Sequence, residues 1–421
     1  MSVEGSGRLL TSWKEIADYL GVTVRTAQRW EAEQGLPVRR LGGDRARVAA
    51  DCSELDAWRL RSTSKRRPWN SLRFLRAYAL VLTVAVVGYA VKETGSLIAT
   101  LLSRVPASFQ IFGEDLVVTD NTGREMWRHT TPEIAESSVY TAGFRTKGVW
   151  FGDLGPRQKA NMLFTLVPQG QGHKGHLLYC FSSRGSVQWQ FNPGRTVRED
   201  AATFSPPFHI RVLRVFPSPK KDGTKWVAVT SVHHWFHPCQ VAILDEAGRL
   251  LYEYWHSGHL DAMETRDLDG DGIEEILLAG VNQQDRQATL VVLEPCKLDG
   301  KPLAQPSEPV PIPTSDPKIL VAAASFPRTS LNYKLEEFNF AYEIGFTDGV
   351  VRVLVKEQIR GPWPYLIYDL DRNLNLVRLE TSVNLANRYR ELKALGVLDH
   401  EFSPALLERL RGKYRVERYE P

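Results

Sequence analysis

The residues of this chain best suited to chemistry are the acidic ones in a short segment at positions 267 to 275. The segment reads Asp-Leu-Asp-Gly-Asp-Gly-Ile-Glu-Glu, so it places carboxylates at loop positions 1, 3, 5 and 9. Hard oxygen ligands at this spacing, with a backbone carbonyl at position 7, suit Ca²⁺, and the two glycines permit a tight curl. We therefore predict one Ca²⁺ site, with a polar turn that binds no metal as the alternative. The predicted ligands are Asp267, Asp269, Asp271, Ile273 through its carbonyl oxygen, and Glu275.

Two other polar segments are weaker candidates. The spacing of His233, His237 and Cys239 permits a zinc site, but they follow a run typical of a strand, where neighbouring side chains point to opposite faces. We interpret this segment as a loop instead. The segment Asp369 to Asn375 imitates the start of the acidic segment, yet it lacks the glycines and the final carboxylate. We interpret it as a turn between strands.

The second chemically distinctive set is basic and lies near the N-terminus. Ser12 and Glu15 have the spacing of a capping box, which begins a helix, and Thr23 can cap a second helix from Val24 to about Glu33. Two short helices joined by a tight turn form a helix-turn-helix. Near its N-terminal end, the second helix carries side chains that can meet base edges and phosphates. These are Arg25, Thr26, Gln28 and Arg29.

A basic hairpin and a third helix complete this N-terminal pattern. Two arginine-bearing arms flank Gly42 and Gly43, which predicts a β-hairpin wing, and Ser53 to Trp58 opens the next helix. Over residues 9 to 61 this order resembles the MerR and excisionase family of winged helix-turn-helix domains. The resemblance implies binding to double-stranded DNA, with a solvated basic face or a protein-binding head as the alternatives. The wing residues it implies are Arg39, Arg40, Arg45 and Arg47.

An apolar run, Phe74 to Val91, follows this basic head. Residues 1 to 76 hold 15 Lys and Arg against 9 Asp and Glu, whereas few basic residues follow the run closely. A helix of this length reaches about 27 Å, close to the hydrocarbon thickness of a bilayer. We predict one transmembrane helix at 74–91, between a basic juxtamembrane linker at 65–73 and a second linker at 92–107. The positive-inside rule then places the N-terminus in the cytoplasm and the rest outside a bacterial inner membrane. A buried core helix is the alternative.

The remaining sequence shows a loose repeat of strand, polar glycine turn and strand. Three copies align on Gly123, Gly185 and Gly248, spaced 62 and 63 residues apart. Repeated antiparallel hairpins predict a β-propeller over 108–382, and a pair of β-sandwiches is the structural alternative. The acidic segment resembles the FG-GAP and VCBS calcium loops of integrin-alpha-like propellers. Residues 383–421 have the spacing of a helical hairpin, with an edge strand after it.

These features predict a multidomain chain: a small α+β winged helix-turn-helix at 1–64, one transmembrane helix, and a large all-β domain with a C-terminal helical hairpin. The predicted function is a membrane-anchored, DNA-binding transcriptional regulator with an extracytoplasmic domain that senses an unknown ligand or protein. One head would read only a half-site, which favours a homodimer. The main alternative is an envelope scaffold whose propeller binds protein or glycan and whose head is a tether. No nucleophile motif or Gly-rich phosphate loop occurs, so we predict no enzyme; a quinone-type propeller enzyme is the rival.

Overall fold

The computed structural model describes residues 8–42, 47–63, 104–141, 147–170, 175–233, 237–303, 310–312, 318–358 and 363–419. The chain divides into two compact units, Met1–Leu102 and Ser103–Pro421, which are called the head and the body below. The division lies within the segment 92–107 that we predicted as the second linker.

In the described residues of the head, three helices and a three-stranded sheet surround one small core. Its strands are ordered β1-β3-β2, and β2 and β3 form the predicted wing hairpin. The Ser12 hydroxyl accepts from the Glu15 amide at 3.2 Å, while the Glu15 carboxylate accepts from the Thr11 amide at 2.8 Å, which confirms a capping box at this helix start. The elements are β1 (Leu9–Leu10), α1 (Trp13–Leu20), α2 (Val24–Gln34), β2 (Arg39–Leu41), β3 (Arg47–Asp51) and α3 (Cys52–Thr63).

The described part of the body contains five antiparallel sheets that follow one another along the chain. The first holds β4 (Ser108–Phe112), β5 (Asp115–Thr119) and β6 (Glu125–Thr130); the second β7 (Val149–Gly152), β8 (Asn161–Leu166), β9 (Leu177–Phe181) and β10 (Val187–Phe191). The third holds β13 (Phe208–Pro217), β14 (Lys225–His233), β15 (Cys239–Leu244) and β16 (Leu250–His256). The fourth holds β17 (Gly258–Arg266), β18 (Glu275–Asn282), β19 (Gln287–Leu293), β21 (Leu320–Phe326) and β26 (Arg415–Arg418); the fifth β22 (Asn339–Thr347), β23 (Val350–Glu357), β24 (Tyr365–Leu370) and β25 (Leu376–Thr381).

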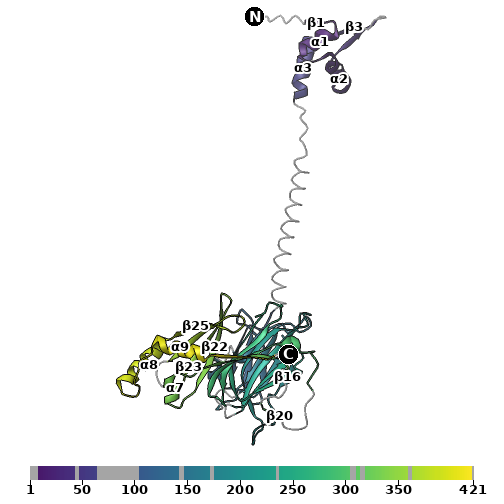
Figure 1. Cartoon of the computed structure of the whole chain (residues 1–421). Helices are drawn as coiled ribbons and strands as arrows, with labels where there is room; N and C mark the ends of the chain where they lie inside the picture. Colours follow the sequence, from purple (N-terminus) through teal and green to yellow (C-terminus); the bar gives the residue numbers. More distant parts are fainter. Residues whose placement is uncertain are drawn as a thin grey trace. The chain divides into compact units, whose positions relative to one another are not determined.

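Smaller elements connect or cover these sheets. A short sheet combines β12 (Ala202–Phe204), β11 (Val197–Glu199) and β20 (Val310–Pro311). The helices are α5 (Ser137–Thr141), the 3-10 helix η1 (Pro295–Lys297), α7 (Ser330–Lys334), α8 (Val383–Ala394) and α9 (Pro404–Lys413). The predicted helical hairpin is confirmed as α8 and α9, which contact β24 and β25 of the fifth sheet (Figure 1). The strand predicted after it is β26, which pairs with β21 of the fourth sheet.

The turn glycines of the repeat explain its period. Each has a positive φ, and each sits at the hairpin turn of one of the first three sheets. A Cβ on Gly185 would lie 2.6 Å from the Trp127 ring of the preceding sheet, and a Cβ on Gly248 would lie 2.4 Å from the Trp189 ring. The tryptophan that ends one repeat therefore packs on the turn glycine of the next, which only a residue without a side chain permits.

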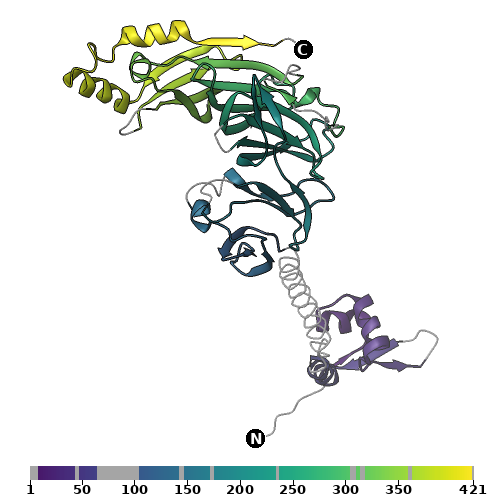
Figure 2. The same ribbon diagram turned by 90° about the horizontal axis from the view of Figure 1, so that it is seen from below.

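The predicted propeller ring is wrong, because the five sheets form an open array. A separate apolar cluster joins each sheet to the next, from Phe109 and Phe164 at the first junction to Leu290 and Val353 at the last. Within the described residues no cluster joins the first sheet to the fifth, and Figure 2 shows these two sheets toward opposite ends of the body. The same local hairpins occur in a closed ring of sheets and in an open array. The repeat in the sequence therefore could not show whether the first and last sheets meet.

The predicted membrane anchor is also corrected. In the ranges that the structure describes, no helix is long and apolar enough to cross a bilayer. The longest, α3 and α8, have 12 residues each, about 18 Å of helix against roughly 30 Å of hydrocarbon. This finding overturns the transmembrane helix in the predicted fold class and the predicted inner-membrane localisation. The apolar run 74–91 itself lies outside the described residues, as do 65–73 and 92–103.

Candidate functional site

The N-terminal turn of α2 presents the predicted DNA-contacting residues. Thr23 caps the helix by accepting from the Thr26 amide at 3.3 Å. Arg25, Gln28 and Arg29 are exposed, whereas Ala27 between them is fully buried in the head core. Positions i, i+3 and i+4 share one face of a helix, so these three side chains project together into solvent.

Thr26 also takes part in the cap of the helix. Its hydroxyl lies 2.8 Å from the Thr23 hydroxyl, and its side chain is half-buried. It therefore belongs to the cap that begins α2.

The wing places further arginines on strands beside the helices. Arg39, Arg40 and Arg47 are exposed on β2 and β3, while the predicted Arg45 lies outside the described residues. Arg40 pairs with Glu31 of α2 at 3.2 Å, and Arg39 pairs with Glu54 of α3 at 2.5 Å. These carboxylates went unrecognised in the sequence, because 9 and 15 residues separate the partners and no local pattern links them.

The predicted calcium ligands lie in the loop between β17 and β18. Asp267, Asp269 and Glu275 come together there, with one carboxylate oxygen from each within 4.8 Å of the others. Asp271 is not part of this group, because its carboxylate turns back to accept from the Ile273 amide at 2.7 Å. Three of the predicted side-chain ligands therefore converge and one does not.

Backbone amides hold these carboxylates in place. Asp267 accepts from the Gly270 and Gly272 amides at 2.7 and 3.0 Å, and Glu275 accepts from the Leu268 amide at 2.7 Å. Burial raises the pKa of Glu275 to about 7, with a further contribution from the neighbouring Asp269. A cluster of carboxylate oxygens fits a cation such as Ca²⁺, and of the three residues Glu275 is buried, Asp267 half-buried and Asp269 exposed. The fit is partial, since three of the four predicted side-chain ligands form the group.

The two weaker polar segments, 369–375 and 233–239, have different outcomes in the structure. The Asp371 carboxylate accepts from the Asn373 and Asn375 amides at 2.9 and 2.8 Å, so the segment after β24 is the turn that we predicted. His233 and Cys239 are buried on adjacent strands, and neither belongs to a metal-ligating group in the described part of the chain. Residues 234–236 of that segment lie outside it.

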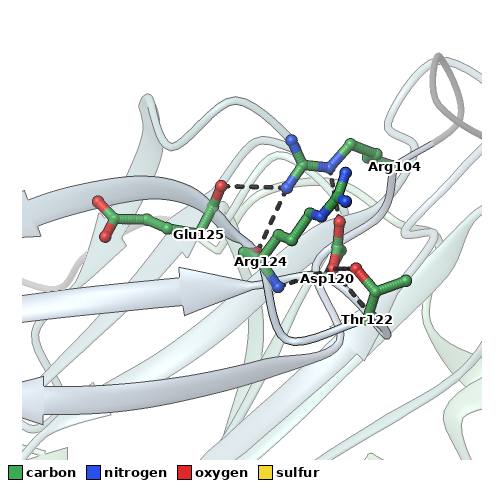
Figure 3. Close-up of polar contacts among 5 residues, drawn as sticks. All are labelled: Arg104, Asp120, Thr122, Arg124 and Glu125. Atoms are coloured by element: carbon green, nitrogen blue, oxygen red, sulfur yellow. Dashed lines mark hydrogen bonds and ion pairs between the residues drawn. The ribbon is translucent and has the colours of Figure 1, made fainter.

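A polar network at the start of the body had no sequence signal. The buried Asp120 carboxylate accepts from the Thr122 hydroxyl and amide, from the Arg124 amide, and from Arg104 at 2.6 Å (Figure 3). Arg104 also donates to the Arg124 and Glu125 carbonyls. These hydrogen bonds, led by the one from the Thr122 hydroxyl, hold the pKa of Asp120 well below its usual range. The network links Arg104, at the start of the described part of the body, to the turn between β5 and β6 of the first sheet.

Comparisons with known proteins do not assign a family. No family model and no curated protein matches the sequence. A crystal structure of BBS1N in complex with ARL6DN is 11% identical with a TM-score of 0.28, over 67% of this chain and 84% of that chain. The V. cholerae biofilm matrix protein Bap1 is 11% identical with a TM-score of 0.21, over 66% and 61%. Likenesses with such low TM-scores carry no information on function.

Proposed function

We propose that the head binds double-stranded DNA and that the chain is a DNA-binding regulator whose body is a binding module. One observation carries this proposal: Arg25, Gln28 and Arg29 share the exposed face of a capped helix whose opposite face is in the core. Arginine can contact guanine with two hydrogen bonds and glutamine can do the same with adenine, so this face offers a means of base readout in the major groove.

The wing supports the same function through the phosphate backbone. Arg47 is exposed on β3, and Arg39 and Arg40 make exposed ion pairs that are weak in water. Phosphates can replace the two glutamates as partners, which would add salt-dependent affinity that does not depend on sequence. A homodimer would align two such heads on neighbouring half-sites.

The body contributes a second part of the proposal. Its acidic loop binds Ca²⁺ through Asp267, Asp269 and Glu275, and Ca²⁺ there neutralises carboxylates that repel one another. The proposal for this loop is separate from that for the head, and each can fail alone.

The DNA proposal is tested with the full-length protein and a pool of random duplexes, followed by affinity measurements at several salt concentrations. Arg25→Ala should cost about 1–3 kcal/mol on the selected sequence and relax its specificity. Arg47→Ala should weaken all duplexes alike and reduce the salt slope by about 1. Arg59→Ala on α3 is the matched control and should leave both unchanged. A full-length protein without salt-dependent affinity for any duplex would contradict the proposal and favour a scaffold.

A further inference from the structure

A cavity of about 290 Å³ lies at the junction of the third and fourth sheets, away from the acidic loop. Its walls come from β16, from the link between β16 and β17, from the β18–β19 hairpin, and from β21 and β26. Segments from residue 254 to residue 419 thus meet around one space, which is called the junction cavity below.

Ser257 gives the junction cavity an unmet hydrogen-bonding group. The residue is 4% exposed and lines the cavity, and its hydroxyl has no hydrogen-bond partner among the described residues. A buried hydroxyl without a partner is destabilising, so such groups are usually satisfied by something bound.

The backbone beside Ser257 is fixed. Its carbonyl accepts from the Gln283 amide at 2.9 Å. The next residue is Gly258, where a Cβ would lie 1.9 Å from the Val281 carbonyl oxygen. The chain is therefore pressed against β18 at this point, and the Ser257 hydroxyl cannot gain a partner by a shift of the backbone.

His256 supplies an acceptor on the same wall. Its Nε2 lies 3.3 Å from the Val281 carbonyl oxygen, and a carbonyl only accepts, so the proton of the ring is on Nε2. Burial lowers the pKa of His256 to about 4, so the ring is neutral near pH 7. Its Nδ1 is then a hydrogen-bond acceptor.

The other lining residues define the charge of a ligand. The described residues around the cavity include the exposed carboxylates of Asp285 and Glu417 but no lysine or arginine, which disfavours anions. The amides of Asn282 and Gln284 add donors as well as acceptors. An ammonium group only donates and would leave these donors unmatched, whereas a hydroxyl both donates and accepts.

We propose that the junction cavity binds a small neutral polyol of about monosaccharide size, whose hydroxyls bond to Ser257 and His256. The volume lies near the lower end of the range for ligand pockets. Because Glu417 and Tyr419 line the cavity, a bound polyol also contacts the segment that contains β26.

The test uses the full-length protein with D-glucose, D-galactose and myo-inositol as probes, measured by saturation-transfer NMR and calorimetry. At least one should bind with a Kd below about 10 mM. Ser257→Ala should weaken that binding about tenfold without lowering the melting temperature, since the lost hydroxyl has no partner in the unbound protein. The matched control is Thr230→Val on β14, whose hydroxyl is equally buried and without a partner but does not line the cavity. This control should bind as the unmodified protein does.

Three results would overturn the inference. The first is that none of the three polyols binds at about 10 mM. The second is that Ser257→Ala binds as tightly as the unmodified protein, and the third is that methylammonium binds at this site in place of the polyols. None of these results bears on DNA binding by the head, so the two proposals fail separately.

Discussion

The head and the body hold their candidate binding groups in opposite ways. In the head, Arg25, Gln28 and Arg29 project from one helix into solvent around a small core. In the body, Ser257 and His256 are buried between sheets. A surface carried by one element can change residue by residue without loss of the fold. A site enclosed by several elements is coupled to stability, so its polar groups have measurable folding consequences.

The largest predicted effect separates the stabilities of the two units. Leu55 is fully buried in the head core, and Leu55→Ala should cost about 2–5 kcal/mol. Hydrogen exchange followed by mass spectrometry should then show loss of protection in residues 8–63 and unchanged protection in the body. Leu60→Ala, at a residue 75% exposed, is the control and should change little. Loss of protection in both units together would show that the head and the body fold as one.

The next effect concerns a buried carboxylate of the body. Glu357 is fully buried, it accepts from the Thr329 hydroxyl at 3.1 Å, and burial raises its pKa to about 7 although Arg328 opposes the shift. Below about pH 4.5 the Glu357 carboxyl group is protonated in both the folded and the unfolded protein. Between about pH 4.5 and 7 only the unfolded state releases it, so the free energy of unfolding falls by roughly 3 kcal/mol with rising pH.

Glu357→Gln removes the titrating carboxyl group. The difference in the free energy of unfolding between this variant and the unmodified protein therefore reports the pH dependence that Glu357 contributes. Urea unfolding at pH 4.5, 6 and 7.5 should show the difference between variant and unmodified protein growing across this window and constant above it. Parallel stability curves would mean that Glu357 keeps an ordinary pKa in the folded body.

Calcium should stabilise the body by a smaller amount. At ten times the Kd, a single site contributes about 1.4 kcal/mol, so the melting temperature of the full-length protein should rise with millimolar Ca²⁺ and fall with chelator. Asp269→Ala should abolish the response. Asp371→Ala, in the acidic turn after β24, should lower the melting temperature but keep the response. Equal melting with and without Ca²⁺ would reduce the acidic loop to a structural turn.

The smallest predicted effect returns to the head. Glu31→Gln frees Arg40 from its exposed ion pair, so the affinity for DNA should rise about two- to threefold, in line with the worth of such pairs. Asp56→Asn is the control for the change in net charge, because Asp56 accepts from Tyr19 and, among the described wing arginines Arg39, Arg40 and Arg47, pairs with none. An equal gain in both variants would assign the effect to net charge alone.

These contrasts also explain what could be predicted from sequence. The capping box of Ser12 and Glu15 and the hairpin turn at Gly185 depend on contacts between residues close in sequence. Their local patterns therefore predicted the capping box and the hairpins correctly. The acidic loop was predicted in part, since the spacing could not show that Asp271 turns to the Ile273 amide. The open array and the junction cavity depend on contacts between distant segments, and no local pattern encodes them.

The place of β26 in the fourth sheet bears on how the protein is made. After β21 is translated, residues 327–414 must follow before β26 can pair with it. At about 5–20 residues per second, the outer edge of β21 stays unpaired for on the order of ten seconds in each synthesis. An unpaired edge strand is a template for strands of other chains, so neighbouring nascent chains on one messenger are competitors for this edge. Slow translation across residues 327–414 would prolong that competition.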